Sequence, residues 1–328
     1  MILRNRRRVA EKLLVSCEVR VHRILINFPT NIGDTILALP SLDLIKGSYP
    51  QAKITAIATS NTQDFLKRHY FLDEVVLYNK QWPLREKIRF CLSLKNKYQL
   101  IVDFKNSLLP IILGVKRRTP FIRRKRFFSK IHSKDRYINL VAHLLKEKRV
   151  KKGEFFLEEG EKKKWDSLEL NKAIFVATSS RSSLKVYPQE NLREVIASLS
   201  KKFLIVLIGE KEEKDYYQGV SLFNNIINLV GQTTIFDIYY LLKKFALLLL
   251  SVDTSILHLG SYLNVPIVAL FGPTSHFQFG PWSDKSLVLF NKEIKCRPCE
   301  LSTCKFNYEC MRGINPQDVV KAVLELGI

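Results

Sequence analysis

Short apolar runs rich in Val, Ile and Leu alternate along the chain with amphipathic stretches, and this alternation occurs twice. Such runs occupy residues 22–28, 53–59, 74–79 and 100–104 in the first half, and 173–178, 203–209, 226–230, 246–252 and 266–272 in the second. Strands that alternate with helices predict βαβ units and parallel sheets. We therefore expect an α/β fold with two Rossmann-like domains that face a central cleft.

The amphipathic stretches predict the helices between these strands. They cover residues 35–47, 62–70 and 83–97, and then 189–201, 211–222, 234–245, 254–264 and 316–326. A polar segment, 146–167, is the expected joint, although it equally fits a short hairpin and a helix. We predict a basic extension over residues 1–21, a first domain over 22–155 and a second domain over 156–328.

Charge changes this picture, because the 328 residues carry a formal net charge of +22. Residues 114–153 contain 15 lysines and arginines against two acids, and residues 1–23 contain seven against two. Solvated surfaces explain most charged runs. The stretch 117–130, RRTPFIRRKRFFSK, also carries three Phe, which favours a surface for an anionic, partly apolar partner.

The apolar runs bear on location. The longest of them, 108–115 and 246–252, fall far short of the roughly 20 residues that span a bilayer. The basic N-terminal stretch contains no apolar segment of signal-peptide length. We expect a cytoplasmic protein, whose six cysteines are then more often thiols or metal ligands than disulfides.

Three strand-to-helix loops carry candidate chemistry, because ligands of open α/β sheets bind at the carboxyl ends of the strands. In the first loop, 29–42, Asp34 is a candidate helix cap and a candidate catalytic group that points into the cleft, and the two roles are compatible. In the second, 177–192, Thr178, Ser179, Ser180, Arg181 and Lys185 suit phosphate oxygens, unless they form only a polar surface loop.

The third loop, 251–274, places Asp253, Thr254 and Ser255 at a strand-to-helix turn. The free N–H groups of that helix attract a diphosphate. The alternative interpretation of Asp253 is a helix N-cap. The alternative for His258, about one turn further on, is a core histidine whose hydrogen bonds are satisfied. A fourth cluster, Cys296, Cys299, Cys304 and Cys310, fits a structural zinc site, a disulfide pair or free thiols, and its spacing is not a standard knuckle.

Some signatures are absent from the sequence. There is no P-loop and no G-x-G-x-x-G, and none of the twelve Asp forms an Asp-x-Asp pair. The charge alone would also fit a nucleic-acid-binding protein, but the sequence has no RRM, zinc-finger or helix-turn-helix signature.

Taken together, ILINFPTNIGDTILALPSL, TSSRSSLKVYPQENL, GEKEEK with LVGQTTIFDIYYLL, and DTSILHLGSYLNVPIVALFGPT resemble glycosyltransferase family 9, the lipopolysaccharide heptosyltransferases. The resemblance covers about residues 22–325 and includes the tail that ends in CMRGINPQDVV. It implies a GT-B fold and inverting transfer without metal or cofactor, from an ADP-heptose to lipid A–Kdo or a core oligosaccharide. It further implies an enzyme that touches the anionic inner face of the inner membrane and binds no nucleic acid.

The resemblance also implies roles for residues. Asp34 matches the general base, and Lys185 matches the residue that holds the donor diphosphate together with Ser179 and Ser180. The nucleotide and phosphate loop corresponds to Asp253, Thr254, Ser255 and His258. Glu213 or Glu212 matches an acid that contacts the nucleoside.

Two departures concern the donor. The family loop has Gly where this chain has Ser255, and the loop before Lys185 is longer than in the best-known members. A family-9 transferase for another nucleotide-sugar or another surface glycan therefore stays open as an alternative. A non-catalytic family-9 protein that acts in assembly is a further alternative, and the presence of Asp34, Lys185 and His258 argues against it.

Overall fold

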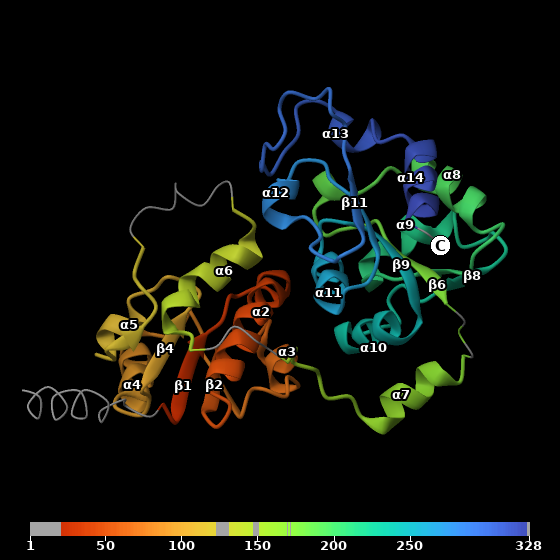
Figure 1. Cartoon of the computed structure of the whole chain (residues 1–328). Coiled ribbons are helices and arrows are strands. Elements are labelled where there is room, and N and C mark those ends of the chain that lie inside the picture. The colour runs from red at the N-terminus through yellow and green to blue at the C-terminus, as the bar shows by residue number, and fades with distance from the viewer. Residues whose placement is uncertain (1–20, 123–130, 147–150, 169, 171, 327–328) are drawn as a thin grey trace, which may run out of the picture.

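The structure is a computed structural model that describes residues 21–122, 131–146, 151–168, 170 and 172–326. Its strands form two sheets in which every pairing between strands is parallel, one in each of two lobes (Figure 1). The first sheet has the order β3-β2-β1-β4-β5 and the second β11-β10-β9-β6-β7-β8. This arrangement confirms the predicted α/β class with two parallel sheets.

Strands of the first lobe are β1 (Arg23–Asn27), β2 (Lys53–Ala58), β3 (Glu74–Leu77), β4 (Leu100–Asp103) and β5 (Arg117–Arg118). Strands of the second lobe are β6 (Ala173–Ala177), β7 (Ile205–Leu207), β8 (Ile226–Asn228), β9 (Ala246–Val252), β10 (Ile267–Leu270) and β11 (Ser286–Leu289). The central strands β1, β4, β6 and β9 are buried over most of their length, since helices cover both faces of a parallel sheet.

Successive side chains of β1 point to opposite faces of the first sheet, and different helices cover each face. Ile24 and Ile26 point toward α2 (Ile32–Ser48) and α6 (Ser133–Val141), in the large core. Leu25 points to the opposite face, which α4 (Leu84–Leu94) and α5 (Leu109–Ile112) cover. The short α3 (Gln63–Lys67) and the turn η2 (Ala142–Leu144) complete this lobe.

The second sheet is covered in the same way. On one face lie α8 (Gln189–Leu199) and α14 (Pro316–Glu325), and on the other α10 (Ile235–Phe245) and α11 (Ser255–Leu263). Shorter elements are α7 (Glu159–Asp166), η3 (Ser183–Lys185), η4 (Lys211–Glu213), α9 (Lys214–Gln218), α12 (His276–Phe279) and α13 (Glu309–Arg312).

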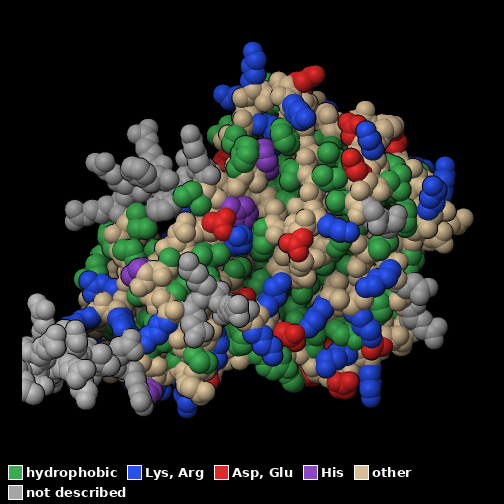
Figure 2. Space-filling view, viewed as in Figure 1, with side chains coloured by type: hydrophobic (Ala, Val, Ile, Leu, Met, Phe, Trp, Pro, Cys, Tyr) green, Lys and Arg blue, Asp and Glu red, His purple; other side chains and the backbone are tan. Residues whose placement is uncertain are grey.

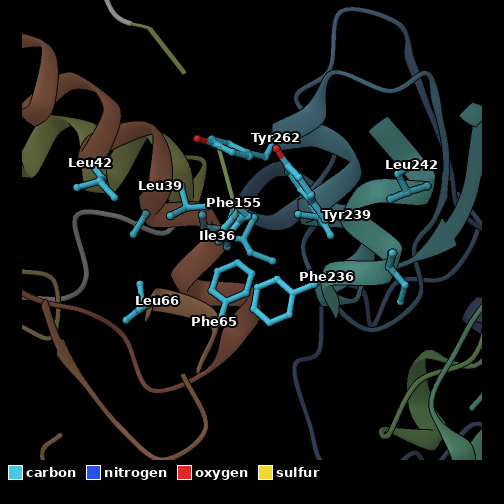
Figure 3. Close-up of a cluster of buried hydrophobic side chains, with 14 of the residues drawn as sticks. Ile36, Leu39, Leu42, Phe65, Leu66, Phe155, Phe236, Tyr239, Leu242 and Tyr262 are labelled. Carbon is cyan, nitrogen blue, oxygen red and sulfur yellow. The ribbon is translucent and has the colours of Figure 1, made fainter. Parts of the chain in front are cut away.

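One buried apolar cluster joins the two lobes below the cleft. It includes Ile36 and Leu39 of α2 together with Phe236 of α10 and Tyr262 of α11, and Phe155 lies between them (Figure 3). Since α2 packs directly against α11, the helix that carries Asp34 touches the helix that carries His258.

Several elements differ from the sequence prediction. The pattern misses the edge strands β5 and β11 and the helices α5, α6, α12 and α13, and the stretch 211–222 divides into η4 and α9. Within its described residues, 146 and 151–167, the joint contains a helix, α7, and a single bridge between His69 and Phe155 rather than a hairpin of its own. We keep a division near residue 155 as a proposal, because Phe155 pairs with the first lobe whereas α7 packs on α10. The predicted extension 1–21 lies almost wholly outside the described residues.

Candidate active site

The site lies between the lobes, where the carboxyl ends of both sheets face each other. A cavity of about 440 Å³ opens there. From the first lobe it is lined by Asn31, Gly33 and Asp34, and from the second by Ser182, Leu184, Lys185, Asp253, Thr254, Ser255, His258, Pro273, Thr274, Phe279, Glu300 and Leu301. Figure 2 shows acidic, basic and histidine side chains gathered in the middle of this face.

A second cavity of about 410 Å³ adjoins the first and shares four of its residues: Asn31, Gly33, Thr254 and Ser255. Its other walls come from Ile32, Asn61, Ala177, Ser179, Ser180, Arg181, Glu210, Glu213 and Ile256. The two cavities therefore form one continuous cleft along the helix starts of α2 and α11.

Asp34 lies in the first turn of α2, whose N-cap is Asn31. It is therefore not the cap, and the cap interpretation of Asp34 is wrong. Burial raises the pKa of the Asp34 carboxyl, and the Arg136 guanidinium opposes this effect, as does a hydrogen bond from Asn31. A partly buried carboxylate with a raised pKa can accept a proton from a substrate hydroxyl.

Lys185, Asp253 and His258 form a chain of polar contacts on the opposite wall. The Lys185 ammonium donates to the Asp253 carboxylate at 2.7 Å, and the other oxygen of that carboxylate lies 3.6 Å from His258 Nε2. Thr254, not Asp253, is the N-cap of α11. The cap interpretation of Asp253 is therefore also wrong, because its side chain holds Lys185 over the cleft.

His258 is buried but not satisfied. Its Nδ1 has no hydrogen-bond partner, and its ring stacks on Trp282 at a centroid distance of 6.0 Å. Burial lowers the pKa of His258 to about 4, so that the ring is neutral at pH 7. His258 lines the cavity, and its buried, unpaired Nδ1 distinguishes it from a core histidine whose ring nitrogens are both hydrogen-bonded.

The first turn of α11 also faces the cleft. Its first N–H groups have no partner within the helix, and the Thr254 side chain makes no capping bond to them. Ser255 begins this helix beside Gly33. A Cβ placed on Gly33 would lie 3.8 Å from Ser255 Cα. This arrangement suits an anion at the helix terminus.

The hydroxyl-rich loop divides between cleft and core. Ser179, Ser180 and Arg181 line the second cavity with Glu213, and Arg181 pairs with Glu210 at 2.7 Å. Thr178 is the exception, because it is fully buried and its backbone and side chain bond Tyr217 and Tyr216. The structure does not bring Thr178 to the cleft surface, so its expected phosphate contact has no geometric basis.

The cysteine cluster has no metal geometry. All five cysteines among the described residues are free thiols. Within the same residues, no three His, Cys, Asp or Glu side chains are arranged to hold a metal ion. Cys296, Cys299, Cys304 and Cys310 instead line a small cavity of about 60 Å³ behind the loop that carries Leu301.

Sequence reasoning missed Arg136, the positive charge with the largest effect on Asp34. It lies on α6, which the apolar pattern did not predict, within a long basic stretch that offered no signal to single it out. Glu300 and Leu301 were also missed, because the loop that carries them was assigned only to the cysteine cluster.

Two parallel α/β lobes with a polar cleft at the carboxyl ends of their strands define the GT-B architecture. The sequence profile of glycosyltransferase family 9 (heptosyltransferase) matches residues 89–309. The chain therefore belongs to glycosyltransferase family 9 and is a glycosyltransferase.

Similar proteins extend over nearly the whole chain. A lipooligosaccharide heptosyltransferase 2 of Campylobacter jejuni is 24% identical over 322 residues, which are 93% of this chain and 99% of the relative. A lipopolysaccharide heptosyltransferase 3 of Escherichia coli is 22% identical and covers 90% and 96%.

Solved structures show the same fold. The ADP-heptose LPS heptosyltransferase II of E. coli has a TM-score of 0.70 at 21% identity, with coverage of 93% of this chain and 98% of that chain. A family 9 glycosyltransferase from Veillonella parvula has a TM-score of 0.76 at 19% identity, covering 93% and 97%. None of the helices in the described ranges combines the length and apolar character needed to cross a membrane.

Proposed function

We propose that this enzyme transfers a heptose from an ADP-activated donor to the inner core of a lipopolysaccharide or lipooligosaccharide, with inversion and without a metal ion. The observation that carries the proposal is the cleft itself, where Asp34 of the first lobe faces Lys185 and the start of α11 in the second. The relatives' names, lipooligosaccharide and lipopolysaccharide heptosyltransferase, support the substrate class.

In the proposed reaction the acceptor hydroxyl oxygen attacks the anomeric carbon of the donor. The bond from that carbon to the β-phosphate oxygen breaks on the other side, and ADP leaves. Asp34 takes the hydroxyl proton as general base. Lys185 and the N–H groups of α11 stabilise the charge that develops on the departing diphosphate, which is the work that a metal ion performs in other transferases.

The remaining residues position the donor. The neutral His258 ring offers one nitrogen to the donor, and Asp253 orients both His258 and Lys185. In this proposal, Ser179, Ser180 and Arg181 extend the phosphate site into the second cavity, and Glu213, which also lines that cavity, contacts the nucleoside. Burial raises the pKa of the Glu213 carboxyl.

The acceptor side lies next to Asp34. A cavity of about 390 Å³ in the first lobe is lined by Lys105 and Arg136 together with Phe104, Ile122 and Tyr137. Two cations among apolar walls suit a phosphorylated or carboxylated sugar. The predicted basic and aromatic segment continues into residues 123–130, which lie outside the described residues. We place the enzyme at the inner face of the inner membrane, where its lipid-linked acceptor is made.

Another nucleotide-sugar is the second candidate, and Ser255 is the observation that favours it. Its side chain projects where the family has Gly, beside both cavities. Titration calorimetry with ADP, UDP and GDP separates the two, because the proposal requires ADP to bind most tightly. Preferred binding of UDP or GDP would support the alternative.

The direct test is mass spectrometry of lipopolysaccharide from a strain that lacks the gene. The proposal expects a core shortened by a heptose, restored by the wild-type enzyme. A core with every heptose in place and another sugar missing would assign the enzyme to a different donor.

A further inference from the structure

The outer face of α4 is apolar although it faces solvent. Leu84, Ile88 and Leu92 follow one another at intervals of four residues, so they form one stripe along the helix, and they are 72%, 51% and 62% exposed. The inner face of the helix is already occupied, because Phe90, Cys91 and Leu94 pack on the sheet. The stripe is therefore additional to the face that folding buries.

A second apolar group continues this surface. Exposed apolar side chains occur at Leu108, which precedes α5, and at Ile111 and Ile112 within it. Phe121, after β5, is also exposed. Eight of the sixteen large exposed apolar side chains in the described part of the chain fall between Leu77 and Phe121. Such a concentration within one short segment marks an interaction surface.

The two groups belong to one face of the molecule. Leu94 of α4 and Leu109 and Leu113 at α5 share a single buried cluster, so both helices cover the same side of the first sheet. Figure 1 places α4 and α5 at the outer end of the first lobe, away from the second lobe. We define the docking face as Leu84, Ile88, Leu92, Leu108, Ile111 and Ile112.

Aromatic side chains lie beside the start of α4. The rings of Tyr78, Trp82 and Phe90 contact one another at centroid distances of 5.4 to 5.8 Å, and each ring is half-buried. Tyr and Trp combine an apolar body with a polar tip, which suits the boundary between water and lipid.

Basic side chains surround the apolar stripe. Between residues 84 and 97 five lysines and arginines accompany a single acid, Glu86. Exposed apolar side chains flanked by cations are typical of elements that lie in the surface of an anionic bilayer. The same charge disfavours a second copy of this chain on the face, because two identical basic rims would repel each other.

We propose that the docking face inserts its apolar side chains into the surface of an anionic lipid bilayer, while the flanking cations bind lipid phosphates. This assignment rests on the proposed function, in that a lipid-linked acceptor explains why the enzyme sits on a membrane. The loop from β4 to α5 carries Lys105 and Asn106 of the acceptor cavity. The docked face thus lies next to the cavity that leads, through Arg136, to Asp34.

The test is flotation of the full chain with vesicles of phosphatidylcholine, with and without phosphatidylglycerol. The variant Leu84→Gln/Ile88→Gln/Leu92→Gln removes the stripe, and Gln keeps a helix propensity close to that of Leu. We expect the wild type to bind the anionic vesicles in a salt-sensitive manner. The affinity of the triple variant for the same vesicles should be lower by about tenfold or more. Leu222→Gln is the matched control, since Leu222 is 86% exposed on the second lobe, and it should bind as the wild type does.

Two outcomes would overturn the proposal: unchanged vesicle binding by the triple variant, or an equal loss in the Leu222 control. A dimer that dissociates in the triple variant while vesicle binding persists would instead assign the face to a second copy.

Turnover of a deacylated, water-soluble acceptor distinguishes a failure of the docking-face proposal from a failure of the proposed heptosyltransferase function. The triple variant should turn it over like the wild type. Vesicle binding by an enzyme that transfers no heptose would defeat the proposed function and leave the docking face intact.

Discussion

Lys185 shows how one residue connects the two walls of the cleft. Its ammonium is held by the Asp253 carboxylate at 2.7 Å, and its charge also lowers the pKa of Asp34 across the cleft. A lysine fixed in this way provides positive charge for a diphosphate without a reorganisation of its long side chain at each turnover.

Replacing Lys185 with Ala should therefore weaken donor binding. The lost charge-assisted contact predicts an increase in the ADP dissociation constant of about tenfold or more, measurable by titration calorimetry. Lys201→Ala, at an exposed position beyond α8, is the control and should leave ADP affinity unchanged. Normal ADP affinity in the Lys185 variant, with altered acceptor affinity, would refute the role.

For single residues, the sequence predicted which side chains line the cleft, but it assigned the N-caps of α2 and α11 to the wrong residues. Asp34, Lys185, Asp253 and His258 were all predicted, because each follows a strand at the cleft edge. The caps were misassigned by one to three positions, since Asn31 and Thr254 begin the helices instead. Side chains of the Asp, Asn and Thr type cap equally well, so local sequence could not choose between them.

Among the elements, α11 depends on a close approach to the sheet at Gly260. A Cβ added there would lie 2.6 Å from Leu249 Cδ2 and 3.4 Å from Ile267 Cδ1. Leu249 and Ile267 are fully buried, so neither side chain has free space to move into. The same helix begins after Thr254 and carries Ser255 and His258, so its packing on β9 and β10 sets the geometry of the proposed donor wall.

We expect Gly260→Ala to lower the free energy of unfolding by about 1–3 kcal/mol, the usual effect of overpacking. Gly160→Ala is the matched control, because a Cβ at Gly160 in α7 meets no atom within 4 Å, and it should be neutral or stabilising by up to about 1 kcal/mol. Urea unfolding of both variants checks this. Equal stabilities would contradict the packing account of α11.

Element prediction worked where the pattern was strong. The strand Ala246–Val252 and the helix Pro316–Glu325 match their predicted ranges to within a residue. The helix α6 was missed because only two of its apolar side chains, Tyr137 and Val141, are buried, and the residues before Tyr137 are polar or charged. It forms a helix because these two side chains complete the large core with α2, a contact that local sequence does not contain.

For the whole molecule, the packing of the lobes is the feature that the sequence could not predict. Asp43 of α2 accepts hydrogen bonds from Tyr262 of α11 at 3.0 Å and from the Gly153 backbone at 2.9 Å. Along the chain, Tyr262 is 219 residues from Asp43 and Gly153 is 110 residues from it. The alternation of strands and helices predicted two parallel sheets. No periodicity in the sequence indicates that a carboxylate in one lobe contacts a tyrosine in the other.

Asp43 makes the stability of this junction depend on pH. Burial raises the pKa of Asp43 from 3.8 to about 6, so the folded protein binds its proton more tightly than the unfolded chain does. The stability that this group contributes is present below about pH 4 and is lost as the pH rises through 6.

In Asp43→Asn this dependence should disappear. Relative to the wild type, the variant should gain about 3 kcal/mol of unfolding free energy between pH 4 and pH 7, as measured by urea unfolding at several pH values. A difference between variant and wild type that stays constant over this range would show that Asp43 does not titrate in the folded protein.

The central claim is that a base from the first lobe acts on a donor held by the second. Asp34→Asn keeps the shape of the side chain and removes the base, so transfer from ADP-heptose should fall by about 10²–10⁴-fold, while the ADP dissociation constant measured on the same preparation stays within about twofold of wild type. A variant that retains more than a few per cent of wild-type turnover, or that loses ADP binding together with activity, would contradict the account.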